Sequence, residues 1–153
     1  MNKKCIAIII ILLALVLGGA YKFLIQGSVT DGKDGRTVIL LDAGERLYIL
    51  GEMRALLGHM QELITAISDD DMDKVIKISK TLVDDSGGKT PTRIIAKMPI
   101  AFKQISINIH SDFKQLLAES TEKRDGKLAL KQVSKIMQNC LACHATHSLM
   151  PKQ

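Results

Sequence analysis

The sequence predicts an all-α protein: an antiparallel four-helix bundle preceded by an N-terminal apolar membrane helix or signal. Three observations predict this class. An apolar run opens the chain, four later segments carry apolar residues at spacings of three and four, and loops rich in Gly, Pro or Asp separate those segments. Four amphipathic helices joined by short loops each bury one face against the other three, as in an antiparallel bundle.

Composition limits the class of protein further. The chain has 153 residues, which is the size of about one domain. It has no Trp, two Tyr and three Phe, so aliphatic residues must form most of the core. The formal net charge is +5, and residues 1–20 carry two lysines and no acid, which leaves +3 for the rest. Lysines alternate with acids along the chain, which indicates solvated helix faces, and we expect no nucleic-acid partner.

The N-terminus has the pattern of a membrane signal. Lys3 and Lys4 precede an apolar run from Cys5 to Ile25, which is long enough to cross a bilayer as one helix. Two interpretations remain open: a signal peptide cleaved after the small residues 18–20, or an uncleaved anchor that leaves both lysines in the cytoplasm. The length of the run favours the anchor, and both interpretations export the remainder. We therefore divide the chain into residues 1–25 (signal or anchor), 26–41 (linker) and 42–153 (a four-helix domain).

The linker and the first helix follow. Turn dipeptides at 31–32 and 34–35 mark the linker, and residues 36–41 are β-prone. The first helix begins at Asp42, where Glu45 completes a capping-box pattern, and ends near Ser68. Its predicted inward stripe is Leu50, Met53, Leu57, Met60, Ile64 and Ile67.

Three further helices complete the predicted bundle. The second runs over 70–83 with Ser68 as its cap, and residues 84–91 form a loop. The third covers 92–121 and should break or kink at Pro99. The fourth follows the turn at 125–126 and runs over 127–149. Their predicted stripes are Met72, Val75, Ser79 and Leu82; Phe102, Ile105, Ile109, Phe113 and Leu116; and Leu130, Val133, Met137, Cys140 and His144.

The last helix carries the motif that bears chemistry, Cys140-Leu141-Ala142-Cys143-His144. Two thiols at this spacing can each add to a vinyl group on the same haem edge, and the adjacent imidazole can bind the iron. The motif predicts one covalently bound haem c, attached at Cys140 and Cys143, with His144 as an axial iron ligand. Export supports this prediction, because c-type haem is attached outside the cytoplasm.

Other chemistries fit the motif less well. A redox-active cysteine pair normally lies at a helix N-terminus, where the dipole lowers the thiol pKa, whereas Cys140 and Cys143 come late in a helix. A zinc site would need more ligands, and the two cysteines with His144 and His147 in one short helix cannot easily surround a tetrahedral ion.

The second axial ligand is open on the residues alone. Met53 and Met60 lie on the first helix's stripe, and His59 and His110 lie beside stripes. Each has an ordinary structural role as well, because a core Met usually fills space and a lone His usually lies at the surface.

The four helices with C-x-x-C-H on the last one resemble the cytochrome c′ superfamily over residues 42–150. Met53, followed seven residues on by Met60, is similar to the first helix of the superfamily's low-spin subgroup. That resemblance implies that Met53 is the second axial ligand and that Met60 is packing. Many relatives form homodimers, so the resemblance leaves a homodimer open for this chain.

The sequence departs from this family at three positions. Members commonly have an aromatic and then a basic residue where this chain has His147 and Ser148. Five-coordinate members have an arginine where this chain has Ile49, so Arg46 or Arg54 would have to replace it.

Together these features predict a one-electron carrier on the periplasmic side of the cytoplasmic membrane, or soluble in the periplasm if the signal is cleaved. Its partners would be redox proteins of a respiratory chain. We expect no enzyme, because no catalytic constellation shares a face. The alternative is a haem protein, five-coordinate or with a displaceable Met53, that binds or senses small gases such as nitric oxide. A sensor module would need a partner that supplies the output.

Overall fold

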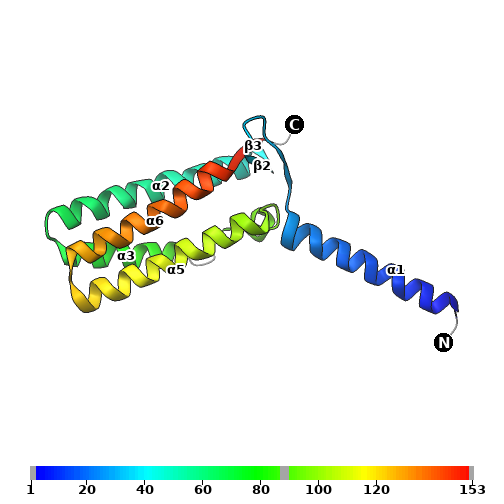
Figure 1. Cartoon of the computed structure of the whole chain (residues 1–153), viewed down its shortest axis with the longest axis horizontal. Coiled ribbons are helices and arrows are strands. Elements are labelled where there is room, and N and C mark those ends of the chain that lie inside the picture. The colour runs from blue at the N-terminus through cyan, green and yellow to red at the C-terminus, as the bar shows by residue number, and fades with distance from the viewer. Residues whose placement is uncertain (1–2, 87–89, 152–153) are drawn as a thin grey trace.

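The computed structural model describes residues 3–86 and 90–151. The chain is mostly helical, with an N-terminal apolar helix and a small sheet (Figure 1). The elements are, in order, α1 (Lys3–Ala20), the π-helical segment η1 (Tyr21–Gln26), β1 (Val29–Asp31), β2 (Thr37–Leu41), α2 (Ala43–Ser68), α3 (Met72–Ser86), α4 (Thr92–Ile95), α5 (Ile100–Lys123), α6 (Gly126–Thr146) and β3 (His147–Pro151). Part of the loop predicted at 84–91 lies outside the described residues, and α3 continues through its first positions.

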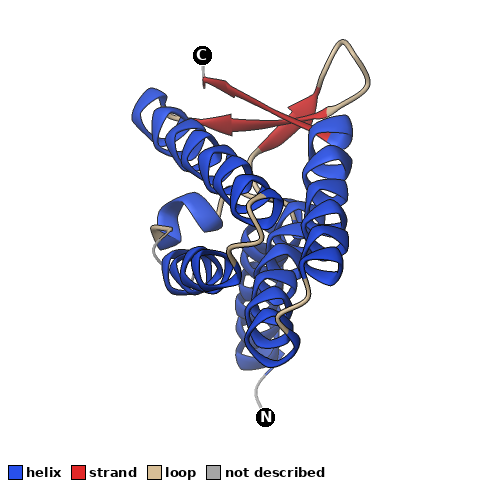
Figure 2. Cartoon of the chain, turned by 90° about the vertical axis from the view of Figure 1, so that its left-hand side faces the viewer, coloured by secondary structure: helices blue, strands red, loops and turns tan. Residues whose placement is uncertain are grey.

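Four long helices pack along one another. Each of α2, α3, α5 and α6 contacts the next in the chain, and α6 returns to contact α2 (Figure 2). Between them lies a main core whose largest fully buried side chains include Leu63, Phe113, Leu116 and Ile136. Two of these come from α5, and α2 and α6 supply one each, so the faces turned toward the shared axis are the apolar ones.

Most of the predicted helix ends are confirmed. The capping box of Asp42 and Glu45 is present at the start of α2. Pro99 separates α4 from α5, and the Asp125 carboxylate accepts a hydrogen bond from the Leu128 amide at 3.1 Å at the start of α6. The predicted cap Ser68 is wrong, because Ser68 still belongs to α2. Asp71 caps α3 instead, with Oδ1 accepting from the Lys74 amide at 2.9 Å.

The predicted inward stripes are only partly right. Of the predicted core residues, Met60 and Val133 are buried and Met53 is half-buried. Four others are exposed: Leu57, Ile64, Leu130 and Met137. Leu63 and Ile136 are buried in place of their neighbours. The reason is that α6 packs mainly against α5, and α2 packs mainly against α3. The buried faces of α2 and α6 are therefore rotated from the predicted stripes, toward Leu63 and Ile136.

A three-stranded sheet closes one end of the helices. The strand β2 pairs antiparallel with β1 (Val29 opposite Ile39) and parallel with β3 (Thr37 opposite His147). The β-prone part of the linker therefore packs on the body, with Val38, Ile39 and Leu41 buried. The prediction that the last helix reaches 149 is wrong, since α6 ends at Thr146 and residues 147–151 form β3. Pro151 disfavours a helix in the residue before it, which suits a strand here.

A second core lies under this sheet. It consists of Ile39, Leu41, Ile49, Ile94 and Met98. Met53 and Phe102 are among the half-buried residues that pack against it. The second core thus fixes the beginnings of α2 and α5 at the end of the body where α6 also finishes.

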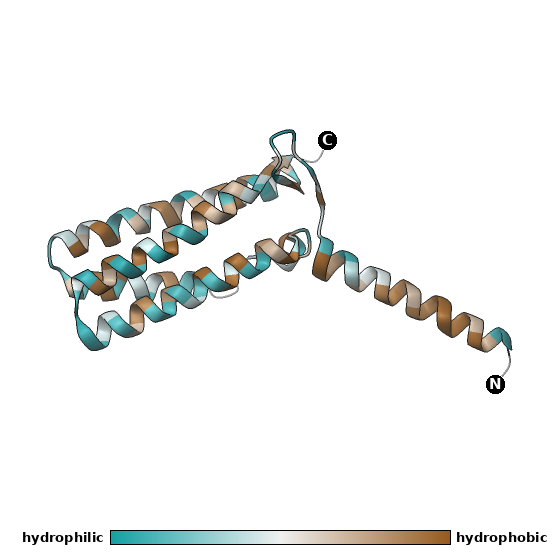
Figure 3. Ribbon diagram, in the orientation of Figure 1, coloured by the Kyte–Doolittle hydropathy of each residue, from teal (hydrophilic) through white to brown (hydrophobic). Residues whose placement is uncertain are grey.

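The helix α1 projects away from the body (Figure 1). Residues Lys3–Gln26 form one candidate membrane span, which contains an 18-residue stretch with a mean hydropathy of 2.6, and none of that stretch is buried within the structure. Figure 3 shows this segment as the longest apolar stretch. Its 24 residues would measure about 36 Å as a helix, against about 30 Å of hydrocarbon in a bilayer. By length and composition it could be an anchor or a signal.

Candidate cofactor site

The C-x-x-C-H motif occupies the last two turns of α6. Cys140 and Cys143 are free, half-buried thiols, and the His144 side chain is exposed. The helix ends just beyond, where the Thr146 hydroxyl donates to the Ala142 carbonyl at 2.8 Å. The His144 carbonyl accepts a hydrogen bond of 3.3 Å from the Arg36 guanidinium. The linker therefore helps to hold the end of the helix that carries the motif.

A cavity of about 160 Å³ lies beside the motif. It brings together three residues predicted to bind the cofactor: Met53 from α2, and Cys143 and His144 from α6. Cys140, almost one turn earlier on α6, is not among the lining residues. The other residues that line the cavity are Arg36, Leu50, Phe102, His147, Ser148 and Leu149.

Partial burial affects the two thiols in the same way. It raises the pKa of Cys140, and a hydrogen bond from the backbone offsets part of this effect. It also raises the pKa of Cys143, to which the negative charge of a Cys140 thiolate adds a smaller contribution. Redox-active cysteines have lowered pKa values, because the thiolate is the reactive form. The environment of this pair is therefore not that of a reactive dithiol.

Two rings meet at the cavity. Phe102 and His147 pack edge to face, with ring centroids 5.7 Å apart and an angle of 80° between the planes. Burial lowers the pKa of His147, and the Thr146 hydroxyl lies 2.8 Å from its Nδ1. Arg36 and Leu149 also line the cavity. Their presence could not be predicted from the sequence, because the linker and β3 are brought to the cavity by the pairing of β2 with β3.

The other candidate ligands lie elsewhere. Met60 is buried in the main core, in agreement with a packing role. His59 Nδ1 lies 3.5 Å from the Glu62 carboxylate and lines a separate, more polar cavity of about 580 Å³ between α2 and α3. His110, half-buried on α5, is not among the residues that line the cavity beside the motif.

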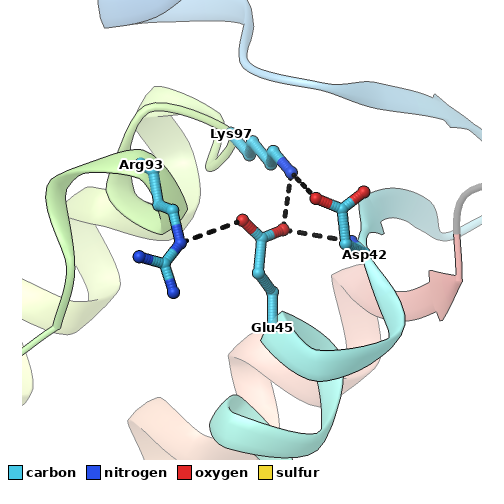
Figure 4. Close-up of polar contacts among 4 residues, drawn as sticks. All are labelled: Asp42, Glu45, Arg93 and Lys97. Atoms are coloured by element: carbon cyan, nitrogen blue, oxygen red, sulfur yellow. Dashed lines mark hydrogen bonds and ion pairs between the residues drawn. The ribbon is translucent and has the colours of Figure 1, made fainter.

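An ion-pair network holds the helix that presents Met53 (Figure 4). The Glu45 carboxylate is 7% exposed, and Lys97 donates to it at 2.5 Å and to Asp42 at 2.9 Å. Arg93 Nε lies 3.6 Å from the other oxygen of Glu45. The hydrogen bonds to Glu45 and, second, to Asp42 raise the pKa of Lys97. This network connects the segment around α4 to the first turn of α2.

The donor set suits a covalently bound haem, whereas the cavity is small for one. Thiols three residues apart, an adjacent imidazole and a thioether on a facing helix are the groups that c-type haem uses. Cofactor pockets usually measure about 300–1,000 Å³, so side chains around the cavity must move apart to admit a haem. Leu57 and Leu141, 68% and 70% exposed and within about one turn of Met53 and the cysteines, offer apolar surface that a haem could cover.

No family model matches the chain, and neither do the curated proteins or the solved structures with which it was compared. Within residues 3–86 and 90–151, no group of three or more His, Cys, Asp or Glu side chains is arranged to hold a metal ion. The assignment of the site therefore depends on the spacing of the motif and on the cavity that Met53 shares with it.

Proposed function

We propose that the protein is an exported mono-haem c-type cytochrome that carries single electrons, and that α2, α3, α5 and α6 form the antiparallel four-helix bundle around its haem. One observation carries the proposal. Met53, which the sequence pairs with His144 only by resemblance, lines the same cavity as Cys143 and His144 although it comes from a different helix. A methionine that merely filled the main core, as Met60 does, would not lie there.

The residues have separate roles in this proposal. The thiols of Cys140 and Cys143 would hold the haem covalently through their sulfur atoms. The imidazole of His144 and the thioether of Met53 would bind its iron. When bound, the haem would supply reversible one-electron chemistry, which the protein tunes through these ligands and their surroundings.

The packing of Met53 favours electron transfer over gas binding. Met53 is half-buried and packs against the second core, which the Glu45 network fastens to the segment around α4. A thioether held on such a wall supports a role for Met53 as a second iron ligand beside His144. If both residues bound the iron, little rearrangement would accompany a change of oxidation state, and a small gas would have to displace Met53.

The apolar helix α1 supports the location that we propose. An N-terminal segment with Lys3 and Lys4 before an apolar run directs the rest of the chain out of the cytoplasm. We propose that the body lies on the periplasmic side of the membrane, where it exchanges electrons with redox proteins of a respiratory chain.

Optical and spin-resonance spectra of the ferric protein test the ligand assignment. We expect a low-spin spectrum with a thioether–iron charge-transfer band in the wild type. Met53→Leu, which removes the sulfur at similar volume, should abolish the band, and the matched control Met60→Leu on the same helix should keep it. A high-spin wild-type spectrum that Met53→Leu leaves unchanged would instead favour the gas-binding function.

A further inference from the structure

The apolar helix joins the body through a tight junction. Gly27, buried with φ +69°, follows η1, and a Cβ on it would lie 2.5 Å from the Lys97 carbonyl oxygen and 2.7 Å from the Met98 carbonyl carbon. The Ser28 amide donates to the Lys97 carbonyl at 2.7 Å, and the Leu40 amide donates to the Ser28 carbonyl at 2.8 Å. The connection is therefore packed and hydrogen-bonded on both sides, unlike a flexible tether.

A side chain of the body caps the end of the apolar segment. Lys103, near the start of α5, donates to the carbonyls of Phe23 at 2.9 Å and Leu24 at 3.2 Å. The last carbonyls of a helical segment have no partner within it and carry the negative end of its dipole. An ammonium group satisfies both, so Lys103 fixes where η1 ends against α5.

The same short segment ties the junction to the cofactor site. The backbone carbonyl of Lys97 accepts a hydrogen bond from the Ser28 amide, and the Lys97 ammonium group donates to Glu45 of α2. Phe102, the neighbour of Lys103 on α5, lines the cavity. Any tilt of the apolar helix relative to the body would therefore strain contacts that also hold the walls of the cavity.

The arrangement of the elements gives this junction a direction. Figure 1 shows α1 leaving the body at the end where β2 and β3 lie, with the α2–α3 and α5–α6 turns at the opposite end. If residues 3–26 cross a bilayer, the sheet end is next to the membrane surface and the turns point away from it. The cavity, lined by β3 and by the beginnings of α2 and α5, belongs to the sheet end.

We propose that the Gly27–Lys103 junction holds the body with its cavity toward the lipid headgroups, so that this end docks on the membrane surface. The site is then reached within the headgroup layer or directly above it.

Crosslinking to lipid tests the placement. The full chain is reconstituted in phosphatidylcholine vesicles that contain a phospholipid with a photoreactive headgroup, and the adducts are mapped by mass spectrometry. A zwitterionic lipid avoids adsorption driven by the net positive charge. We expect adducts within 27–41 and 147–151, and a several-fold lower yield at 67–71 and 121–126.

Variants of the junction make the test specific. Gly27→Ala and Lys103→Met together should open the junction, and we expect the ratio of adducts between the two ends to fall several-fold toward one. Lys114→Met, an exposed lysine further along the same helix, is the matched control and should keep the wild-type ratio. Far-ultraviolet circular dichroism of each variant shows whether the helices are retained.

Three outcomes would overturn the placement: equal labelling of both ends in the wild type, labelling mainly at the far turns, or a mature protein that lacks residues 1–20. The experiment is repeated with Cys140→Ser/Cys143→Ser, which cannot attach haem. Because the expected pattern does not require haem, an unchanged pattern in this variant supports the placement even if the proposed function fails.

Discussion

Lys97 forms an ion pair of 2.5 Å with Glu45, and its carbonyl accepts a hydrogen bond from Ser28, just after the apolar segment. The carboxylate of Glu45 is almost fully buried, whereas Asp42, the second partner of Lys97, is exposed. A buried carboxylate is stable only while its charge is compensated. This pair therefore connects the stability of the site to that of the junction.

Replacement of Lys97 by Met should destabilise the protein measurably. Arg93 remains 3.6 Å from Glu45 but is itself exposed, so the carboxylate loses its closest donor. We expect the free energy of unfolding to fall by about 1–3 kcal/mol. Denaturant titration followed by circular dichroism measures it, with Lys114→Met as the control, which should change little. Similar losses in both variants would contradict a special role for Lys97.

The same pair predicts a dependence on alkaline pH. The folded protein raises the pKa of Lys97 above its ordinary value of 10.5, so the contribution to stability is complete below pH 10.5. It is lost as the pH rises through the higher pKa of the folded state. The stability difference between wild type and Lys97→Met should therefore be constant below pH 10.5 and shrink as the pH is raised above it. A difference that stays constant as the pH rises well above 10.5 would contradict the prediction.

Haem attachment should depend on Cys140 and Cys143 and not on Cys5. Cys140→Ser and Cys143→Ser should each leave one thioether bond, and the double variant should leave none, so that acidified organic solvent extracts all of its haem. Cys5→Ser is the control and should behave as wild type, because Cys5 lies exposed in α1. Mass spectrometry of the denatured chain reads the result directly. Haem retained by the double variant would contradict covalent attachment at the motif.

A pair of leucines on α2 tests the corrected buried face. Leu63 is fully buried in the main core, and Leu57 is 68% exposed. Leu63→Ala should cost about 2–5 kcal/mol, whereas Leu57→Ala should stay within about 0.5 kcal/mol in the Cys140→Ser/Cys143→Ser chain. Thermal and denaturant unfolding of the two variants gives the comparison. A larger loss of stability for Leu57→Ala than for Leu63→Ala would instead support the inward stripe expected from the sequence.

Local signals in the sequence predicted local features of the fold. Asp42 with Glu45, Pro99 and Asp125 each act on the backbone within about one turn, and each marks the helix boundary expected of it. The rotation of a helix about its axis is less local, because it depends on which neighbours the helix packs against. The spacing that runs through Leu57 and Leu130 is regular, and yet both lie outside the core.

For the site, too, local features could be predicted from the sequence and contacts between distant residues could not. The motif at 140–144 can be recognised without any structure, and the resemblance pointed to Met53, which lines the cavity. The sheet and the Lys97–Glu45 pair could not be recognised, because they join residues far apart in the chain. Arg36 therefore gave no sign in the sequence that it would reach the His144 carbonyl.

The parallel pairing of β2 with β3 has a consequence for how the molecule is assembled. It joins residues 37–41 to 147–151, so the chain must close a loop that contains all four long helices. The entropy of closure delays such distant pairing, and we expect the helices to form before it. Because β3 supplies His147, Ser148 and Leu149 to the cavity, we expect this part of its lining to form last. Until β3 pairs, the side of the cavity that these three residues line is open, and we expect a bulky group to reach Cys143 and His144 more easily from that side.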